Sequence, residues 1–213
     1  AATAAKSFAR LYQGRLNSLS GAQLAQAMSE FEAIEEKLGR AGSYASLLFA
    51  ADSSDAAISR FSQSINERLT DISTDLLFFG LELNRLEEAD LQAKMDDPAL
   101  ARWQPYLRDV RMYRPHQLGD DVEKVLLEKS VTGAQAWCRL FDETIAALRV
   151  TVDGQTMTVG DALNRLSDTD RGVRERAGKA VGSVFEGNVR LFALITNTLA
   201  KDKSISDGLR HFA

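Results

Sequence analysis

An apolar seam between residues 58 and 86 is the feature that most constrains the fold. Large apolar side chains recur along it at steps of three and four residues, which places them on one face of an α-helix. The seam consists of Ile58, Phe61, Ile65, Leu69, Ile72, Leu76, Phe79, Leu83 and Leu86. Its mean step of about 3.5 residues resembles that of a coiled coil. Residues 76–83 ("LLFFGLEL") are apolar nearly all round, so this helix is predicted to be the buried spine of the fold.

The prolines indicate where long helices can run. Pro98, Pro105 and Pro115 all lie in one short region. Because proline removes a backbone donor and clashes with the preceding turn, long uninterrupted helices are expected on both sides of that region. Ser20 is a suitable N-cap for a helix that follows it. The other predicted helices cover residues 21–38, 99–113, 120–148 with a kink at Gly133, and 171 to beyond 202.

In one short segment the apolar residues alternate with a period of two, in place of the helical spacing of three and four. The sequence "LRVTVDGQTMTV" alternates on both sides of Asp153-Gly154, and Asp-Gly suits a two-residue type I′ turn. A small β-hairpin is therefore predicted near residues 148–159, with Val150 and Val152 facing Met157 and Val159. The expected fold class is mainly α, with long antiparallel helices in a bundle. We expect residues 1–170 to form a helical domain that includes the hairpin, and residues 171–213 to form a long helix leading towards another domain.

Composition restricts the function classes. The formal charge of −4 argues against a nucleic-acid-binding protein, which usually carries a basic excess. The single cysteine fits a reducing compartment, and no apolar stretch approaches the roughly 20 residues that span a bilayer. A cytoplasmic protein without membrane or nucleic-acid partners is expected. Residues 1–29 contain no acid, which a transit peptide could share, but a first surface helix is the favoured interpretation.

The stretch 114–123 ("RPHQLGDDVE") is a candidate for a metal site or for a helix start. His116 with Asp120 and Asp121 could supply ligands, but zinc sites need three or four, and the second histidine, His211, is far away in the sequence. The peptidase motif His-Glu-x-x-His is absent. We therefore interpret Asp120 as the N-cap and Glu123 as its partner in an acidic variant of the capping box.

Three other features were weighed as reactive or binding groups. Cys138 beside Trp137 is interpreted as a small buried residue, because a nucleophilic cysteine needs a neighbouring base. Glu82 within the apolar run could be a buried acid with a raised pKa; the expected alternative is that it pairs with an arginine such as Arg85 or Arg111, or reaches the rim of the core. Mixed charges in residues 161–179 predict a solvated, ion-paired face rather than a phosphate or peptide-carboxylate site. The basic members are Arg165, Arg171, Arg174, Arg176 and Lys179.

Six motifs, taken in order, resemble a known family. They are "LYQGRL" (11–16), "GSYASLLFAAD" (42–52), "LLFFGLEL" (76–83), "RPHQL" (114–118), "AWCRLFDE" (136–143) and "ITNTLAKDKSISD" (195–207). Together they resemble the N-terminal region of the oligoendopeptidase F family, relatives of thimet oligopeptidase among the zinc metallopeptidases. The family's catalytic His-Glu-x-x-His lies downstream of the matched region.

The resemblance implies a role rather than a reactive site. In such enzymes Zn²⁺ polarises the scissile carbonyl and activates water, with the motif glutamate as general base. No catalytic, cofactor-binding or metal-ligating residue is assigned to this chain, and zinc is expected only in a full-length parent protein. The chain is expected to be inactive alone and to form one wall of a channel that admits short peptides. The missing catalytic domain would be its partner.

Two alternatives remain open at this point. The chain could be a free-standing helical scaffold that binds a protein partner. It could also, more remotely, be a complete enzyme that uses His116 or Cys138.

The glycines at 178, 182 and 187 weaken the last helix by about 1 kcal/mol each relative to alanine, so this helix needs tertiary support. If isolated, it is expected to expose an apolar face near residues 191–199 and to self-associate through it.

Overall fold

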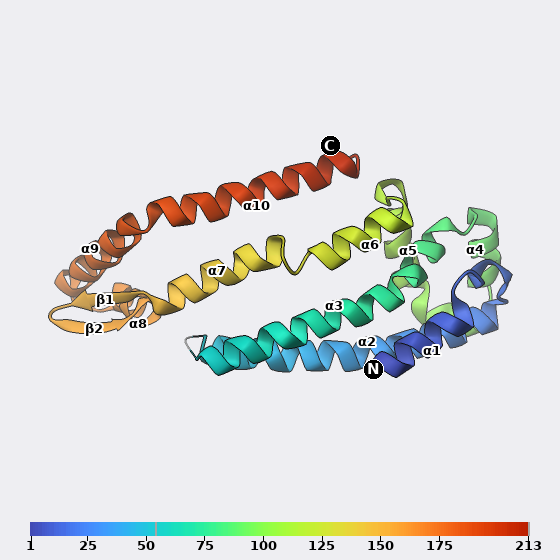
Figure 1. Cartoon of the computed structure of the whole chain (residues 1–213), viewed down its shortest axis with the longest axis horizontal. Coiled ribbons are helices and arrows are strands. Elements are labelled where there is room, and N and C mark those ends of the chain that lie inside the picture. The colour runs from blue at the N-terminus through green and yellow to red at the C-terminus, as the bar shows by residue number, and fades with distance from the viewer. Residues whose placement is uncertain (54, 213) are drawn as a thin grey trace.

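The structure is a computed structural model that describes residues 1–53 and 55–212. Within these residues the chain is mainly α-helical with one two-stranded hairpin, as the sequence predicts. A helical bundle lies at one end of an elongated molecule and the hairpin at the other, and the C-terminal helices run back between them (Figure 1). No helix in the described residues has the length and apolarity that a membrane span requires.

The bundle is built from α1 (Ala2–Tyr12), α2 (Gly21–Ala51) and α3 (Ala56–Arg85). A capping box starts α2, because the Ser20 hydroxyl accepts from the Gln23 N–H at 3.2 Å and the Gln23 amide oxygen accepts from the Ser20 N–H at 2.9 Å. The helix runs to Ala51, well past the predicted end at residue 38. In this added part of α2, Gly42 allows close packing on α3, because a Cβ at position 42 would lie 3.1 Å from Leu69 Cδ1.

The core of the bundle is aromatic at its centre. Phe79 is fully buried and lies 5.1 Å from Phe8 and 4.7 Å from Phe31, measured between ring centroids. The seam along α3 is confirmed where Leu76, Phe79, Leu83 and Leu86 are buried. The predicted burial is wrong at the start of the seam, where Phe61 is 39% exposed. The reason is that α1 does not extend along the first half of α3.

The proline-rich region forms short elements. α4 (Glu88–Met95) is followed by a 3₁₀ helix at Pro98–Trp103 and by α5 (Gln104–Met112). The single helix predicted over 99–113 is therefore divided in two. Pro98 and Pro105 both lie in the first turn of their elements, where a missing N–H costs no hydrogen bond.

The predicted helix over 120–148 is also divided. α6 (Asp120–Lys129) ends in a turn, and α7 (Ala134–Ala147) starts after Gly133. The turn is tight at Gly133, where a Cβ would lie 3.2 Å from the Lys129 carbonyl oxygen and the neighbouring backbone would have to move by a few tenths of an ångström. The predicted kink is thus a full break between two helices.

The hairpin forms where it is predicted, but one predicted pairing is wrong, because Val152 lies opposite Gln155 and Val159 belongs to the helix that follows. β1 (Arg149–Val152) pairs antiparallel with β2 (Gln155–Thr158), and Val150 lies opposite Met157. Asp153 and Gly154 have φ angles of 52° and 80°, as a type I′ turn requires. With α8 (Val159–Asn164) and α9 (Arg171–Gly187) the hairpin encloses a second, smaller core. Its buried members are Val150, Val152, Val159, Ala162, Ala177 and Val181.

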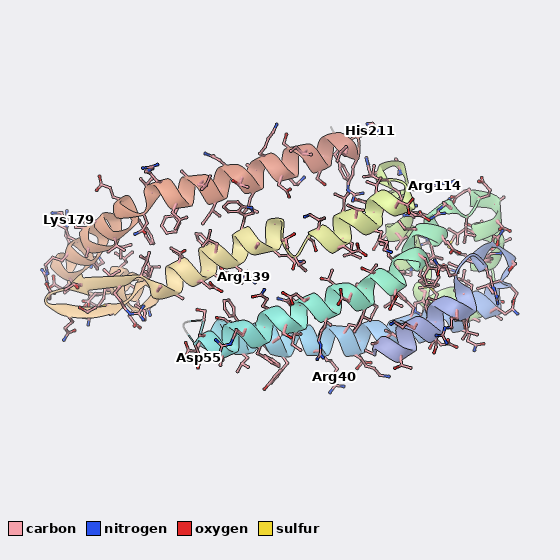
Figure 2. All side chains as sticks on the ribbon, in the orientation of Figure 1. Arg40, Asp55, Arg114, Arg139, Lys179 and His211 are labelled. Atoms are coloured by element: carbon pink, nitrogen blue, oxygen red, sulfur yellow. The ribbon has the colours of Figure 1, made fainter. Side chains whose placement is uncertain are left out.

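The single long helix predicted from residue 171 is wrong. α9 ends at Gly187 and α10 (Val189–Leu209) begins after Asn188, whose backbone has φ −113° and ψ 5°. The Asn188 side chain donates to the Val184 carbonyl at 2.9 Å, which favours the helix end. α10 then runs back alongside α7, and side chains from both helices extend into the space between them (Figure 2).

Removal of the central ring should destabilise the bundle selectively. We expect Phe79→Ala to lower the free energy of unfolding of the bundle by about 3–5 kcal/mol, because the cavity adds to the lost transfer energy. Urea unfolding should be followed by the fluorescence of Trp103, which packs on this core, in a Trp137→Phe background. Phe61→Ala on the same helix is the matched control and should cost less than half as much. Equal losses for the two variants would contradict this view of the core.

Candidate functional site

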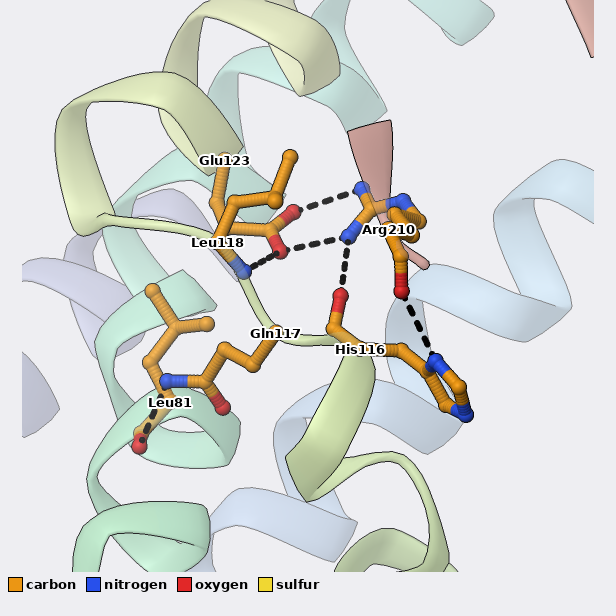
Figure 3. Close-up of polar contacts among 6 residues, drawn as sticks. All are labelled: Leu81, His116, Gln117, Leu118, Glu123 and Arg210. Carbon is orange, nitrogen blue, oxygen red and sulfur yellow. Dashed lines mark hydrogen bonds and ion pairs between the residues drawn. The ribbon is translucent and has the colours of Figure 1, made fainter. Parts of the chain in front are cut away.

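A buried ion pair joins the C-terminal end of α10 to the start of α6. Glu123 on α6 is 8% exposed, and Arg210 follows the end of α10. Arg210 Nη1 donates to Glu123 Oε1 at 2.6 Å and Nη2 to Oε2 at 2.8 Å (Figure 3). The Leu118 N–H also donates to Glu123 Oε1, at 2.9 Å. The carboxylate is therefore well satisfied despite its burial, which is the condition for a favourable buried pair.

His116 belongs to the same cluster. Its Nδ1 lies 2.8 Å from the Arg210 carbonyl oxygen and so acts as the donor, while Arg210 Nη1 donates to the His116 carbonyl at 3.2 Å. The imidazole stacks on Phe212 with ring centroids 3.8 Å apart. In the described part of the chain, no three His, Cys, Asp or Glu side chains gather closely enough to hold a metal ion. We call the group Glu123, Arg210 and His116 the C-terminal clamp.

The electrostatics of the clamp follow from these contacts. Hydrogen bonds from Arg210 hold the pKa of the Glu123 carboxyl below its usual value, against the opposing effect of burial. The Leu118 N–H acts in the same direction as Arg210. Glu123 in turn raises the pKa of the Arg210 guanidinium. The pair is therefore ionised at neutral pH and contributes to stability in that state.

The predicted capping box at this helix start is wrong. Gly119 is the N-cap, Asp120 is the first helical residue, and the Asp120 carboxylate pairs with Arg85. Glu123 binds the Leu118 N–H rather than that of Asp120. Arg210, which is distant in the sequence, binds both oxygens of the Glu123 carboxylate, so Glu123 does not form the predicted capping box.

The main groove lies between the bundle and α7. It has a volume of about 780 Å³, with α2 and α3 on one side and α6 and α7 on the other. It forms because α3 packs against α6 but has little contact with α7 beyond the break at 130–133. Most of its α3 lining is polar and can donate or accept hydrogen bonds. Those residues are Ser59, Ser62, Gln63, Asn66, Glu67, Thr70 and Ser73.

Cys138 lies on the α7 wall of this groove. It is exposed, so the prediction of a small buried residue is wrong. The groove separates α7 from α2 and α3 at this point, which leaves the Cys138 thiol accessible. Trp137 beside it is half-buried. No histidine lines the described part of the groove, so the thiol has no imidazole base there.

Glu82 binds backbone rather than an arginine. Its Oε1 accepts from the Gly14 N–H at 2.6 Å, in the loop after α1 where Gly14 has φ 75°. Arg85 pairs with Asp120, and Arg111 donates to the carbonyl oxygens of Asn84 at 2.6 Å and Leu86 at 2.8 Å. The predicted pairing with Arg85 or Arg111 is therefore wrong, because both arginines have other partners.

The charged segment 161–179 is an ion-paired surface, as predicted. Arg176 binds Asp153 through two hydrogen bonds of 2.6 and 3.1 Å, and these keep the pKa of Asp153 below its ordinary value. Lys179 pairs with Glu175 at 2.6 Å. Arg174 donates to the Asp168 carbonyl at 2.7 Å. These contacts tie the exposed side of α9 to the hairpin and to the loop before α9.

The comparisons with known proteins agree with the motifs. Residues 82–149, which run from the end of α3 to the start of β1, match the family model described as oligopeptidase F. The crystal structure of oligoendopeptidase F from Enterococcus faecium superposes over 99% of this chain, with a TM-score of 0.85 and 20% identity. The chain has the fold of the N-terminal region of oligoendopeptidase F. The resemblance inferred from the sequence is thereby confirmed.

The chain spans less than half of the proteins that it matches. It covers 42% of the Enterococcus faecium oligoendopeptidase F chain. A second structure, from Chlamydophila abortus and provisionally described as a peptidase, covers 91% of this chain with a TM-score of 0.57 and 20% identity, and the match takes in 33% of that protein. No curated protein matches the chain.

The clamp predicts a pH-dependent stability. Because the pKa of Glu123 is lowered by folding, its contribution is fully present above the unfolded value of about 4.3 and is lost as pH falls through the folded value. At pH 7 we expect Glu123→Gln to cost about 3 kcal/mol, since it leaves Arg210 buried without its counter-charge. The cost should vanish in acid, where the wild-type carboxyl is also neutral. Circular dichroism during urea unfolding at several pH values measures both effects.

The matched control for this experiment is Glu175→Gln. It removes one partner of an exposed ion pair on α9 and should leave the unfolding midpoint unchanged. A loss for Glu123→Gln that stayed constant down to pH 2 would show that packing, and not charge, explains the effect.

Proposed function

We propose that the chain is the N-terminal, non-catalytic part of a zinc-dependent oligoendopeptidase and forms one wall of its substrate channel. The observation that carries the proposal is the fold match to the Enterococcus faecium enzyme, which takes in nearly all of this chain and a minor part of that one. The family match over residues 82–149 supports it, because that segment supplies α6 and α7, the second side of the groove. Short peptides are the proposed substrates of the parent protein.

The zinc site of such an enzyme does not fit the residues that the structure describes. His116 uses its Nδ1 on the Arg210 carbonyl and stacks its ring face on Phe212. Of the groove lining, Glu67, Asp142 and Cys138 are the candidate ligands, and they do not gather as a metal-binding group. No step of the reaction is therefore assigned to this chain. We propose that another part of the polypeptide supplies the metal and the general base.

The groove is suited to hold an extended peptide against such a part. Gln63 and Asn66 on α3 and Gln135 on α7 offer both donors and acceptors for peptide groups. Phe49, Leu69 and Leu127 supply apolar lining between them. Pockets that combine a few polar groups with apolar walls are the usual form of a small-ligand site. We propose that this lining binds peptide main chain without strong side-chain selection.

Localisation and domain arrangement are part of the same proposal. The single exposed cysteine is compatible with a reducing compartment, and we propose the cytoplasm. We propose that residues 1–170 form the helical domain and that residues 171–213 lead towards the catalytic domain. Contact with that domain would account for the apolar side chains that are exposed on α6 and α10. They include Val125 at 55%, Val189 at 58%, Leu194 at 54% and Ile205 at 53% exposure.

A free-standing scaffold is the second candidate, and the same exposed side chains favour it. The expectation of an open apolar face over 191–199 needs revision, because α10 folds back on α7 and Ile195 is only 2% exposed. Self-association would then use Leu194 and Ile205, which are exposed. A chain that is monomeric by size-exclusion chromatography at high concentration would count against this candidate.

Activity of the intact gene product tests the main proposal. We expect it to hydrolyse a quenched fluorescent peptide of about ten residues, to lose this activity with a zinc chelator and to regain it with Zn²⁺. The chain 1–213 should be inert under the same conditions. Turnover by a homogeneous sample of 1–213, or an intact product without zinc-dependent activity, would contradict the proposal.

A groove variant tests the role of the wall. Asn66→Trp should obstruct the groove and raise KM for the ten-residue peptide about tenfold, a loss of about 1.4 kcal/mol in binding. Zinc content should not change. Arg68→Trp, two positions along the same helix and outside the groove lining, is the matched control and should leave KM unaltered. Identical effects of both variants would exclude the groove as a peptide site.

A further inference from the structure

The groove between the bundle and α7 carries a thiol on one wall and an unusual hydroxyl on the other. Cys138 on α7 is exposed and lines the groove. Ser62 lines it from α3, within a row of polar residues that recur at steps of three and four along the helix and so share one face. That row consists of Ser59, Ser62, Asn66, Thr70 and Ser73.

The Ser62 hydroxyl lacks a partner although its surroundings are almost closed. The residue is only 7% exposed, and its hydroxyl forms no hydrogen bond within the described residues. The oxygen nevertheless retains accessible surface, unlike the unpartnered side-chain atoms of Asn84, Trp103 and Gln117. Because buried polar groups are nearly always hydrogen-bonded, an accessible but unused hydroxyl at the bottom of a groove indicates a ligand that bonds to it.

The charges in the groove favour a ligand that is not an anion. Two carboxylates of the lining have no cationic partner within the described residues, since Glu67 accepts from the Gln63 amide at 2.8 Å and Asp142 has no charged contact. Arg139, the basic residue of the described lining, lies 3.8 Å from Glu143. A cleft lined by one sign of charge concentrates ligands of the opposite sign and repels those of its own.

We propose that Cys138 captures short cysteine-containing peptides of neutral or positive charge as mixed disulfides. The Ser62 hydroxyl would donate to a peptide carbonyl and hold the peptide disulfide beside the thiol. The thiol has no histidine base in the described lining, so the gain in rate comes from holding the two sulfurs together. The choice of a peptide rests on the proposed function, but capture requires no hydrolysis.

The exchange is balanced without a further oxidant. The Cys138 thiolate attacks one sulfur of the peptide disulfide, the S–S bond of the peptide breaks, and a disulfide between Cys138 and the peptide forms. The other half of the peptide disulfide leaves as a thiolate and takes up a proton, which replaces the one that Cys138 lost. In a reducing compartment other thiols reverse the reaction, so capture would occur only under oxidising conditions.

The kinetics of capture test the proposal. Chain 1–213 is mixed with the disulfide dimer of acetyl-Ala-Cys-Ala amide, and the adduct is followed by intact mass spectrometry. We expect the rate to level off as peptide concentration rises into the millimolar range, because binding precedes exchange. Bis(2-hydroxyethyl) disulfide has no amide groups, and its rate should rise linearly. A linear dependence for the peptide as well would overturn the proposal and leave Cys138 as an ordinary exposed thiol.

A displaced thiol is the control for position. Ser64 is exposed on α3 and is not part of the groove lining. Ser64→Cys in a Cys138→Ser background should react with the peptide disulfide at a rate that stays linear in concentration. Saturation at the displaced thiol equal to that at Cys138 would overturn the proposal.

The variant Ser62→Ala tests the hydroxyl directly. We expect it to raise the peptide concentration at half-maximal rate about fivefold, as the loss of one hydrogen bond does, and to leave the maximal rate unchanged. Folding should be retained, because alanine is a better helix former than serine. Ser64→Ala is the matched control and should change neither quantity. An unaltered half-saturation for Ser62→Ala would overturn the proposal.

Glutathione disulfide tests the charge preference. It is a peptide disulfide of similar size with a net negative charge, so at low salt it should react with Cys138 about fivefold or more slowly than the neutral peptide. Asp142→Asn should reduce this difference. Equal or faster capture of glutathione would overturn the assignment to neutral and cationic peptides.

Failure of this proposal and failure of the proposed function can be told apart. Capture is measured on chain 1–213 without hydrolysis, whereas the peptidase proposal is tested with a cysteine-free peptide and the intact gene product. Hydrolysis without saturable capture would overturn only the inference about Cys138. Saturable capture by a gene product that hydrolyses no peptide would overturn only the proposed function.

Discussion

The contact on which the arrangement of the C-terminal half depends is the Glu123–Arg210 ion pair. Its members are 87 residues apart and are joined by two short, charge-assisted hydrogen bonds in a nearly buried setting. The pair fixes the far end of α10 against the start of α6, while α9 and the hairpin hold its near end. The chain between the two points is thereby held as a closed loop. Without the pair, two buried charges would lose their compensation at once.

The same cluster fixes the short segment from His116 to Leu118. Two hydrogen bonds join Arg210 and His116, and each runs from the side chain of one residue to the backbone carbonyl of the other. The Glu123 carboxylate accepts from the Leu118 N–H. Gln117 lies between these fixed residues, and its amide is therefore restricted in orientation. The Glu123–Arg210 ion pair thus stabilises the fold and also restricts the orientation of the Gln117 side chain. This coupling explains why a short, irregular segment can present a defined hydrogen-bonding group.

Features that depend on neighbours in sequence could be predicted, and those that depend on distant partners could not. The N-cap at Ser20, the type I′ turn at Asp153-Gly154 and the buried end of the α3 seam each follow from local sequence. Glu123 satisfied a local pattern equally well, yet Arg210 determines its contacts. Glu82 was expected to pair with an arginine or to reach the rim of the core, and its carboxylate accepts from the Gly14 N–H. The break at Asn188 divides the long terminal helix, and α10 packs on α7 through Ile195 while Leu194 stays exposed. The exposure of Cys138 depends on the groove, which no single segment encodes.

The two hydrophobic cores have a consequence for how the molecule unfolds. The bundle core and the hairpin core share no residue, and α7 and α10 connect them side by side. Each core can therefore melt at its own temperature, with the paired connecting helices transmitting only part of the cooperativity. Calorimetric and van't Hoff enthalpies should then differ, and one melting temperature would not describe the whole chain.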